Sequence, residues 1–155
     1  MNFSNLLIEL DGPIAWLTVN RPDKLNALNQ DTLTELHQAI QQLKITPEVR
    51  VIVLSGAGSK AFVAGADIAE MRNISPIQAR DFSKLGQDLM LAIEQCGKPV
   101  IAIVGEFDAL PRGLTEAVDA RRVAPERCVD FVHRGNDFAR RLRRGVVVEI
   151  DIHRR

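Results

Sequence analysis

The sequence has few of the residues that build metal sites, disulfide frameworks or membrane spans. Its 155 residues include two cysteines, Cys96 and Cys128, which have no metal-ligand spacing and no second pair to form a disulfide framework. No apolar run approaches the roughly 18 residues that span a bilayer, and the start lacks a basic segment followed by an apolar one. We therefore expect a soluble protein of the reducing cytoplasm, with no membrane association and no metal.

The chain also lacks a net charge. Its 20 Lys and Arg residues balance 20 Asp and Glu residues, and 46% of the residues are hydrophobic. These totals exclude a charge-dominated disordered chain and show no electrostatic footprint for nucleic acid. The length suits one domain with a real core. A small molecule or another protein is the expected partner.

Lysine is absent after residue 104, where arginine becomes the only strong cation. This shift places one boundary in the chain and divides it into residues 1–104 and a tail, residues 105–155. Four arginines between residues 140 and 144 form a cationic cluster of the kind found in nucleic-acid arms. Acidic residues throughout the tail and the lack of interleaved aromatics argue against that use. We expect no nucleic-acid partner.

Apolar runs and helical periodicity alternate along the chain. Runs at residues 6–10, 14–19, 51–55 and 100–104 predict strands, and a run at 146–152 allows a further one. Helical spacing predicts a helix through Leu33 and Leu43, with a cap near Asn29 or Asp31, a second through Phe82 and Ile93, and a short helical stretch opening at Asp67. Alternating strands and helices predict βαβ crossovers and an α/β fold.

A loop of small residues follows the predicted buried strand, from Gly56 to Ala66. Small residues let a ligand approach the backbone. The first amides of the next helix, at Ala66 to Ile68, would lack intrahelical partners and could bind an anion or a developing oxyanion. A turn that merely connects strand to helix is the alternative. The third glycine of a dinucleotide fingerprint and the glycine before the lysine of a P-loop are both missing.

Four segments in order carry a more specific pattern: Asn20 to Leu28 (NRPDKLNAL), Val51 to Gly56 (VIVLSG), Lys60 to Ile68 (KAFVAGADI) and Lys98 to Ala102 (KPVIA). Over residues 1–104 the sequence resembles the crotonase (enoyl-CoA hydratase/isomerase) family, and enoyl-CoA hydratases most of all. The resemblance implies a crotonase-like (ClpP/crotonase) α/β fold with a β-β-α superhelix core, here truncated and followed by a divergent Arg-rich tail.

The resemblance also implies an acyl-CoA thioester ligand, with coenzyme A entering as part of the substrate and no separate cofactor. The family places its CoA contacts at the positions of Lys24, Leu25 and Ala27, with Lys24 as the phosphate partner; a solvated turn lysine is the alternative reading. In the family, a second set of positions supplies the backbone around adenine and pantetheine, and here these positions are Ala64, Gly65, Ala66, Asp67 and Ile68. Within this set, the family uses the amide at the position of Ala66 as one oxyanion donor. Losing one such donor typically costs about 2.7–4 kcal/mol.

The family pattern breaks after residue 104. With one residue inserted, Gly113 takes the place of the second oxyanion donor, and Glu116 lies one position beyond the expected acid/base glutamate. Pro111 has no N–H to donate, and Arg112 has a bulky side chain where glycine is wanted. The tail is hypothesised to be an out-of-register remnant of the same domain. The resemblance implies a trimer built by C-terminal helices; we expect no counterpart of those helices here, so any oligomer need not be that trimer.

The predicted function is that of an enoyl-CoA hydratase-like protein with impaired catalysis. The family reaction is a carbon–oxygen lyase reaction of fatty acid metabolism, in which water adds to a trans-2-enoyl-CoA through an enolate stabilised by an oxyanion hole. Two alternatives stay open: a non-catalytic module that binds acyl-CoA or a partner, and a fragment with no function.

Overall fold

A computed structural model of the chain describes residues 3–104 and 147–149. In chain order the elements are β1 (Leu6–Asp11), β2 (Ile14–Val19), the 3-10 helix η1 (Pro22–Lys24), α1 (Gln30–Ile45), β3 (Val51–Gly56), α2 (Ile68–Met71), α3 (Pro76–Glu94), β4 (Val100–Ala102) and β5 (Val147–Glu149). The predicted elements are confirmed, although β4 is shorter than its apolar run. Within the described ranges, no helix has the length and apolarity needed to cross a membrane.

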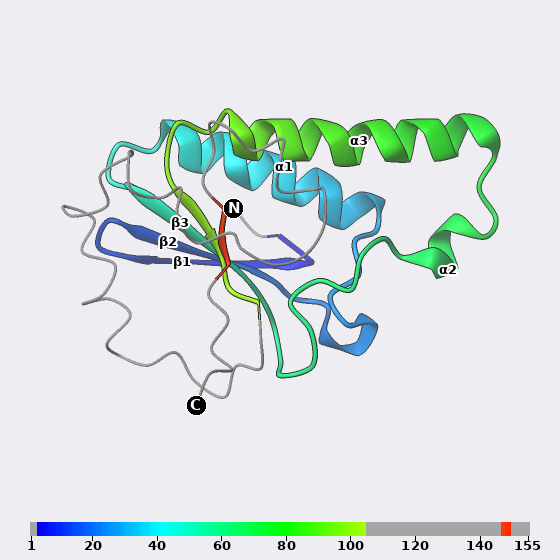
Figure 1. Ribbon diagram of the computed structural model, residues 1–155, viewed down its shortest axis with the longest axis horizontal. Helices are drawn as coiled ribbons and strands as arrows, with labels where there is room; N and C mark the ends of the chain where they lie inside the picture. Colours follow the sequence, from blue (N-terminus) through cyan, green and yellow to red (C-terminus); the bar gives the residue numbers. More distant parts are fainter. Residues whose placement is uncertain (1–2, 105–146, 150–155) are drawn as a thin grey trace.

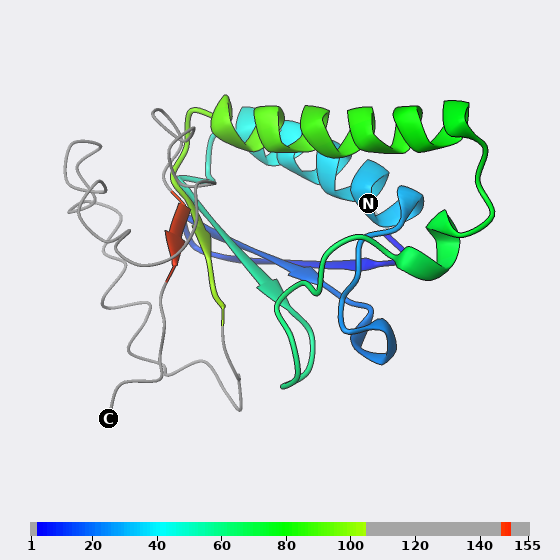
Figure 2. The same cartoon turned by 45° about the vertical axis from the view of Figure 1, so that its right-hand side comes forward.

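The strands form one mixed sheet in the order β1-β2-β3-β4-β5. The β1–β2 pair is an antiparallel hairpin, whereas β2–β3, β3–β4 and β4–β5 are parallel. Helix α1 connects β2 to β3, and α2 and α3 connect β3 to β4. Helices α1 and α3 lie side by side over one face of the sheet (Figures 1 and 2). The α/β fold predicted from the alternation of strands and helices is therefore confirmed.

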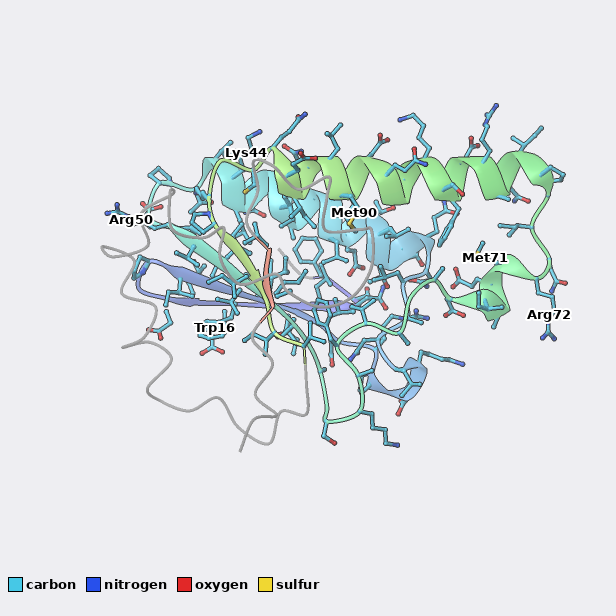
Figure 3. The ribbon with its side chains drawn as sticks, viewed as in Figure 1. Trp16, Lys44, Arg50, Met71, Arg72 and Met90 are labelled. Carbon is cyan, nitrogen blue, oxygen red and sulfur yellow. The ribbon has the colours of Figure 1, made fainter. Side chains whose placement is uncertain are left out.

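Both faces of the central strands are apolar. Ala15, Leu17 and Ile52 belong to the core cluster that packs beneath α1 and α3. Alternate residues such as Ile14 and Val53 belong to a second cluster, which includes Trp16 on the side of the sheet away from these helices (Figure 3). A strand that is buried on both faces needs continuous apolar residues, which explains why β3 shows no alternation in its sequence.

Helix α1 is capped by side chains at both ends. At its start, the Asn29 side chain accepts a hydrogen bond from the Thr32 amide at 2.9 Å. At its end, Lys98 Nζ donates to the carbonyl oxygens of Leu43 and Thr46 at 2.5 and 2.6 Å. These bonds satisfy backbone groups that a helix cannot pair internally, and Lys98 also ties the last turn of α1 to the start of β4. The position of the loop just before α1 is thereby fixed.

Strand β3 ends at Gly56, where the following loop folds back against it. A Cβ atom on Gly56 would lie 2.1 Å from the carbonyl oxygen of Phe62 and 2.6 Å from both the carbonyl oxygen of Ala61 and Nδ2 of Asn26. Two of these three atoms belong to the backbone, so they cannot swing aside as the end of a flexible side chain could. Only glycine lets the loop approach the strand this closely.

We expect Gly56→Ala to lower the free energy of unfolding by about 1–3 kcal/mol or more, because the added methyl group overpacks the loop. The matched control is Gly86→Ala in the interior of α3, where an added Cβ has no neighbour within 4 Å. The control should stabilise the protein by about 0.5–1 kcal/mol, since alanine is the better helix former. Urea unfolding of both variants measures the difference, and equal midpoints would contradict the close approach at Gly56.

Candidate functional site

Two loop segments, residues 25–28 and 64–67, pair through their backbones next to the carboxyl ends of β2 and β3. Leu28 is at the centre of this pairing, which forms a short parallel bridge. Its N–H donates to the carbonyl oxygen of Gly65 at 2.8 Å, and its carbonyl oxygen accepts from the N–H of Asp67 at 2.9 Å. Two motifs that are far apart in the sequence therefore form one structural unit.

This pairing leaves the Ala66 N–H directed away from Leu28. The peptide group between Gly65 and Ala66 is planar and trans, so its carbonyl and its N–H point in opposite directions. The carbonyl points at the Leu28 amide. Within residues 3–104 and 147–149 the Ala66 N–H donates no hydrogen bond, and Ala66 lies in an exposed stretch. Among the residues that the structure describes, the loop therefore presents an unpaired backbone donor at the surface.

A buried asparagine fixes the turn between η1 and α1. Leu25 and Asn26 have φ angles of 51° and 56°, in the left-handed region that most residues avoid and asparagine tolerates best after glycine. Asn26 Oδ1 accepts from the Arg21 amide at 3.0 Å, and Nδ2 donates to the carbonyl oxygens of Ala57 and Ala61 at 2.9 and 2.8 Å. Asn26 is 1% exposed, so this one amide holds the turn against the loop that follows β3.

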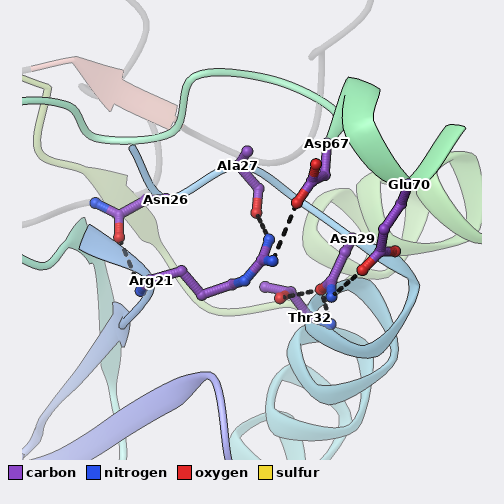
Figure 4. Close-up of polar contacts among 7 residues, drawn as sticks. All are labelled: Arg21, Asn26, Ala27, Asn29, Thr32, Asp67 and Glu70. Carbon is purple, nitrogen blue, oxygen red and sulfur yellow. Dashed lines mark hydrogen bonds and ion pairs between the residues drawn. The ribbon is translucent and has the colours of Figure 1, made fainter. Parts of the chain in front are cut away.

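An ion pair between Arg21 and Asp67 joins the two loop segments (Figure 4). Arg21 Nη2 donates to Asp67 Oδ2 at 3.0 Å, and Nη1 donates to the carbonyl oxygen of Ala27. Burial raises the pKa of Asp67. The hydrogen bond and charge of Arg21, together with the nearby backbone amides of Glu70 and Ala69, outweigh this effect and lower that pKa below its ordinary value. The carboxyl group therefore stays ionised and paired at neutral pH.

A second contact links α1 to α2. Asn29 Nδ2 donates to Glu70 Oε1 at 2.7 Å, while its Oδ1 accepts from both the amide and the hydroxyl of Thr32 (Figure 4). Asn29 thus caps α1 and also holds the short helix that follows the exposed loop. The two carboxylates that follow Ala66, on Asp67 and Glu70, are both engaged in holding the loops together.

The residues predicted from the sequence gather along the paired segments. Lys24 and Leu25 are exposed at the end of η1, and residues 64–66 are exposed beside them in the pairing. Ile68 is 69% exposed, whereas Ala27 and Asp67 are buried at 9% and 8%. The remaining two predicted residues, Gly113 and Glu116, lie outside the described residues.

One part of the sequence prediction is wrong, and another was missing. The amides of residues 66–68 were expected to lack intrahelical partners and to point outward, but the Asp67 amide points at the carbonyl oxygen of Leu28 and bonds to it. Asn29 was predicted as a possible cap of α1, but its bond to Glu70 was not, and no structural role was predicted for Arg21 or Asn26. The Arg21–Asp67 contact joins residues 46 positions apart, and no periodicity relates them. The only signal was the two asparagines in a segment rich in helix breakers.

Comparison with known families and proteins gives a consistent result. Residues 9–110 match the family model described as enoyl-CoA hydratase/isomerase. The crotonyl-CoA hydratase of Syntrophomonas wolfei and the short-chain-enoyl-CoA hydratase of Clostridium acetobutylicum are similar to this chain, each with 45% identity over 107 residues. The match covers 69% of this chain and 41% of each relative. The chain thus spans about two-fifths of the length of these curated relatives.

Solved structures agree with the sequence matches. An enoyl-CoA hydratase from Bacillus anthracis is similar with a TM-score of 0.65 and 31% identity, over 66% of this chain and 40% of that one. An enoyl-CoA hydratase/carnithine racemase from Magnetospirillum magneticum is similar with a TM-score of 0.63 and 32% identity, over 67% of this chain and 40% of that one. The fold predicted from the sequence is confirmed.

We expect Asp67→Asn to lower the free energy of unfolding at pH 7 by about 1.5–3 kcal/mol, the usual range for a hydrogen bond to a charged group. The loss should shrink as the pH falls. The folded-state pKa of Asp67 lies below the ordinary 3.8, so the unfolded chain takes up the proton first. The stabilisation by ionised Asp67 is therefore complete well above pH 3.8 and disappears as the pH falls through the lower pKa of Asp67 in the folded protein.

Urea unfolding at pH 7 and at steps below pH 4 measures this dependence. Asp81→Asn is the matched control, because Asp81 pairs with Arg80 in the open, with side chains 59% and 76% exposed. Its effect should stay within about 0.5 kcal/mol at every pH. A loss for Asp67→Asn that is independent of pH would contradict the ion pair.

Amide hydrogen exchange tests the direction of the Ala66 N–H. We expect this amide to exchange rapidly in the free protein, whereas the neighbouring amides of Ala64 and Asp67 should be protected by their bonds to Leu25 and Leu28. Residue-resolved exchange by NMR measures all three in one sample. Protection of Ala66 equal to that of its neighbours would show that the donor has an acceptor.

Proposed function

The chain belongs to the enoyl-CoA hydratase/isomerase family, and from this we propose that its paired loop segments bind the thioester of an acyl-CoA. The observation that carries the proposal is the exposed Ala66 N–H, which has no acceptor among the described residues. A fixed backbone donor of this kind suits a thioester oxygen on which negative charge develops. Since the neighbouring amides are held by Leu25 and Leu28, the donor keeps its direction without a ligand.

The CoA portion would lie along the exposed residues on both sides of the pairing. Lys24 at the end of η1 offers a cation to the phosphates, and Leu25, which is 45% exposed, offers apolar surface. Ala64 and Gly65 present backbone to adenine and pantetheine, and no described residue lies within 4 Å of where a Cβ of Gly65 would be. The buried Ala27 and Asp67 would shape the site, while Ile68 lies at its edge.

The chemistry proposed for the site is the addition of water to a trans-2-enoyl-CoA. The hydroxyl group joins C3, and the electrons of the C2–C3 double bond move toward the thioester to give an enolate, which then takes a proton at C2. The Ala66 N–H would stabilise the enolate oxygen, a contribution of about 2.7–4 kcal/mol for one such donor. Coenzyme A is part of the substrate, and the proposal includes no further cofactor.

We propose that this chain binds acyl-CoA but that its hydration of enoyl-CoA is impaired. The second donor would have to come from Gly113 and the acid/base group from Glu116, both beyond the point where the family pattern breaks. Pro111 cannot donate a hydrogen bond there. The same sequence feature favours a second candidate, a module that binds acyl-CoA or a partner without catalysis. A chain that does neither would be a fragment without this function.

Binding and turnover, measured in one preparation, separate these candidates. We expect calorimetry to detect binding of butyryl-CoA, and loss of the conjugated thioester absorbance of crotonyl-CoA to be slow or absent. Hydration that is lost on Glu116→Gln would show that the tail completes the site. Binding without hydration supports the module, and the absence of both would overturn the proposed function.

Lys24→Ala should weaken binding of butyryl-CoA by about threefold to tenfold, the effect of losing one charge-assisted contact with a phosphate. The loss should shrink as salt is added. Lys44→Ala is the matched control: Lys44 is also exposed, but it lies in the last turn of α1, at the far end of the helix from the site (Figure 3). Equal dissociation constants for the two variants would remove Lys24 from the binding site.

A further inference from the structure

One guanidinium group reaches both segments of the candidate site. Arg21 Nη1 donates to the carbonyl oxygen of Ala27, the residue before Leu28, and Nη2 donates to the carboxylate of Asp67, the residue after Ala66. A guanidinium is a rigid planar fork of donors, so its two contacts cannot move independently. Arg21 therefore fixes the distance and angle between the two backbones at the point where Leu28 and Ala66 pair.

Arg21 is itself held firmly. Its amide donates to Asn26 Oδ1 at 3.0 Å, and its carbonyl oxygen accepts from the amides of Lys24 and Asn26 at 3.0 and 2.9 Å. Its side chain is only 13% exposed. A donor fork that is anchored through its own backbone can hold another loop in place, since little conformational freedom remains to be lost.

The direction of the Ala66 N–H depends on this arrangement. The N–H is opposite to the Gly65 carbonyl in one planar peptide group, and that carbonyl is held by the Leu28 amide. Without the fork, no side chain would join Ala27 to Asp67. The loops would still be held by the backbone pairing and by the Asn26 and Asn29 bonds on either side of it, but the peptide group between Gly65 and Ala66 could rotate. A small rotation is enough to misdirect a donor, because a hydrogen bond weakens steeply as its angle departs from linear.

We propose that Arg21, acting through Asp67 and the Ala27 carbonyl, is a positioning residue that aims the Ala66 N–H at the thioester oxygen. Arg21 does not touch the acyl-CoA in this proposal. The inference rests on the proposed function, since it needs acyl-CoA to bind at these loops. It adds that a buried ion pair, rather than the backbone pairing alone, sets the strength of the contact with the thioester carbonyl.

Two ligands of equal length isolate this contact. Butyryl-CoA has a thioester carbonyl, whereas S-butyl-CoA is a thioether that lacks it. We expect Arg21→Gln to weaken butyryl-CoA binding by about threefold to tenfold, the value of one hydrogen bond, and to change S-butyl-CoA binding by less than about twofold. Arg80→Gln, which breaks the exposed pair with Asp81 on α3, should change neither. Arg21→Lys, which keeps the charge, should retain part of the affinity for butyryl-CoA that Arg21→Gln loses.

The carbonyl stretching frequency of bound isotope-labelled butyryl-CoA gives an independent reading. A donor aimed at the oxygen lowers this frequency, so the shift should be largest in the wild type, smaller in Arg21→Lys and smallest in Arg21→Gln. Equal losses of both ligands with an unchanged frequency would show that Arg21 only supports the fold, and would overturn the inference. If Arg21→Gln does not fold, the Arg21→Lys comparison decides by the same two readings.

Failure of the proposed function has a different signature, in which the wild type binds neither ligand. Hydrogen exchange in the free protein then decides the positioning inference. The Leu28 amide, which bonds to Gly65, should lose protection in Arg21→Gln but keep it in Arg80→Gln, while the amide of Ile52 in the core stays protected in both. Unchanged protection of Leu28 would overturn the positioning role.

Discussion

The candidate site depends on the pairing of residues 25–28 with residues 64–67, and that pairing is secured by the buried contact between Arg21 and Asp67. Removing two charges from water is costly, and the attraction between them offsets that cost only when the remaining donors and acceptors are also satisfied. Here the second arm of Arg21 is bonded to Ala27, and the nearby amides of Ala69 and Glu70 further lower the pKa of the Asp67 carboxyl group. The pair can therefore remain ionised and fixed in a nearly buried position.

The rest of the described fold positions the two loops that this contact joins. The sheet is apolar on both faces, so β2 and β3 end at fixed points from which the two loops start. Gly56 allows the second loop to return against β3, and Asn26 bonds to that loop where it passes. Asn29 and Lys98 fix the two ends of α1. The side chains of Asn26, Asn29 and Lys98 each bond to backbone groups that no backbone partner fully satisfies.

A backbone donor that is already aimed before the ligand arrives has a chemical advantage, because no reorganisation is needed as charge develops. The loop around Ala66 has this property, since its neighbours are bonded and Ala66 itself is exposed. In the proposed function the described residues supply the binding surface and one donor. Proton transfer and the second donor would come from residues beyond 104, where the family pattern is broken. Binding and catalysis can therefore be separated experimentally in this chain.

The sequence by itself determined the elements and the family. Apolar runs and helical spacing are local properties, so the strands, the two long helices and the α/β class were predictable, and four ordered motifs were enough to identify the family. The exposed positions at Lys24 and Ala66 followed from those motifs. Only the tertiary structure decided how the loops meet: that Arg21 reaches Asp67, that Asn26 is buried in a left-handed turn, and that the Asp67 amide is paired while that of Ala66 has no acceptor in the described part of the chain. These contacts join residues far apart in the chain, and their geometry follows from how the sheet brings the loops together.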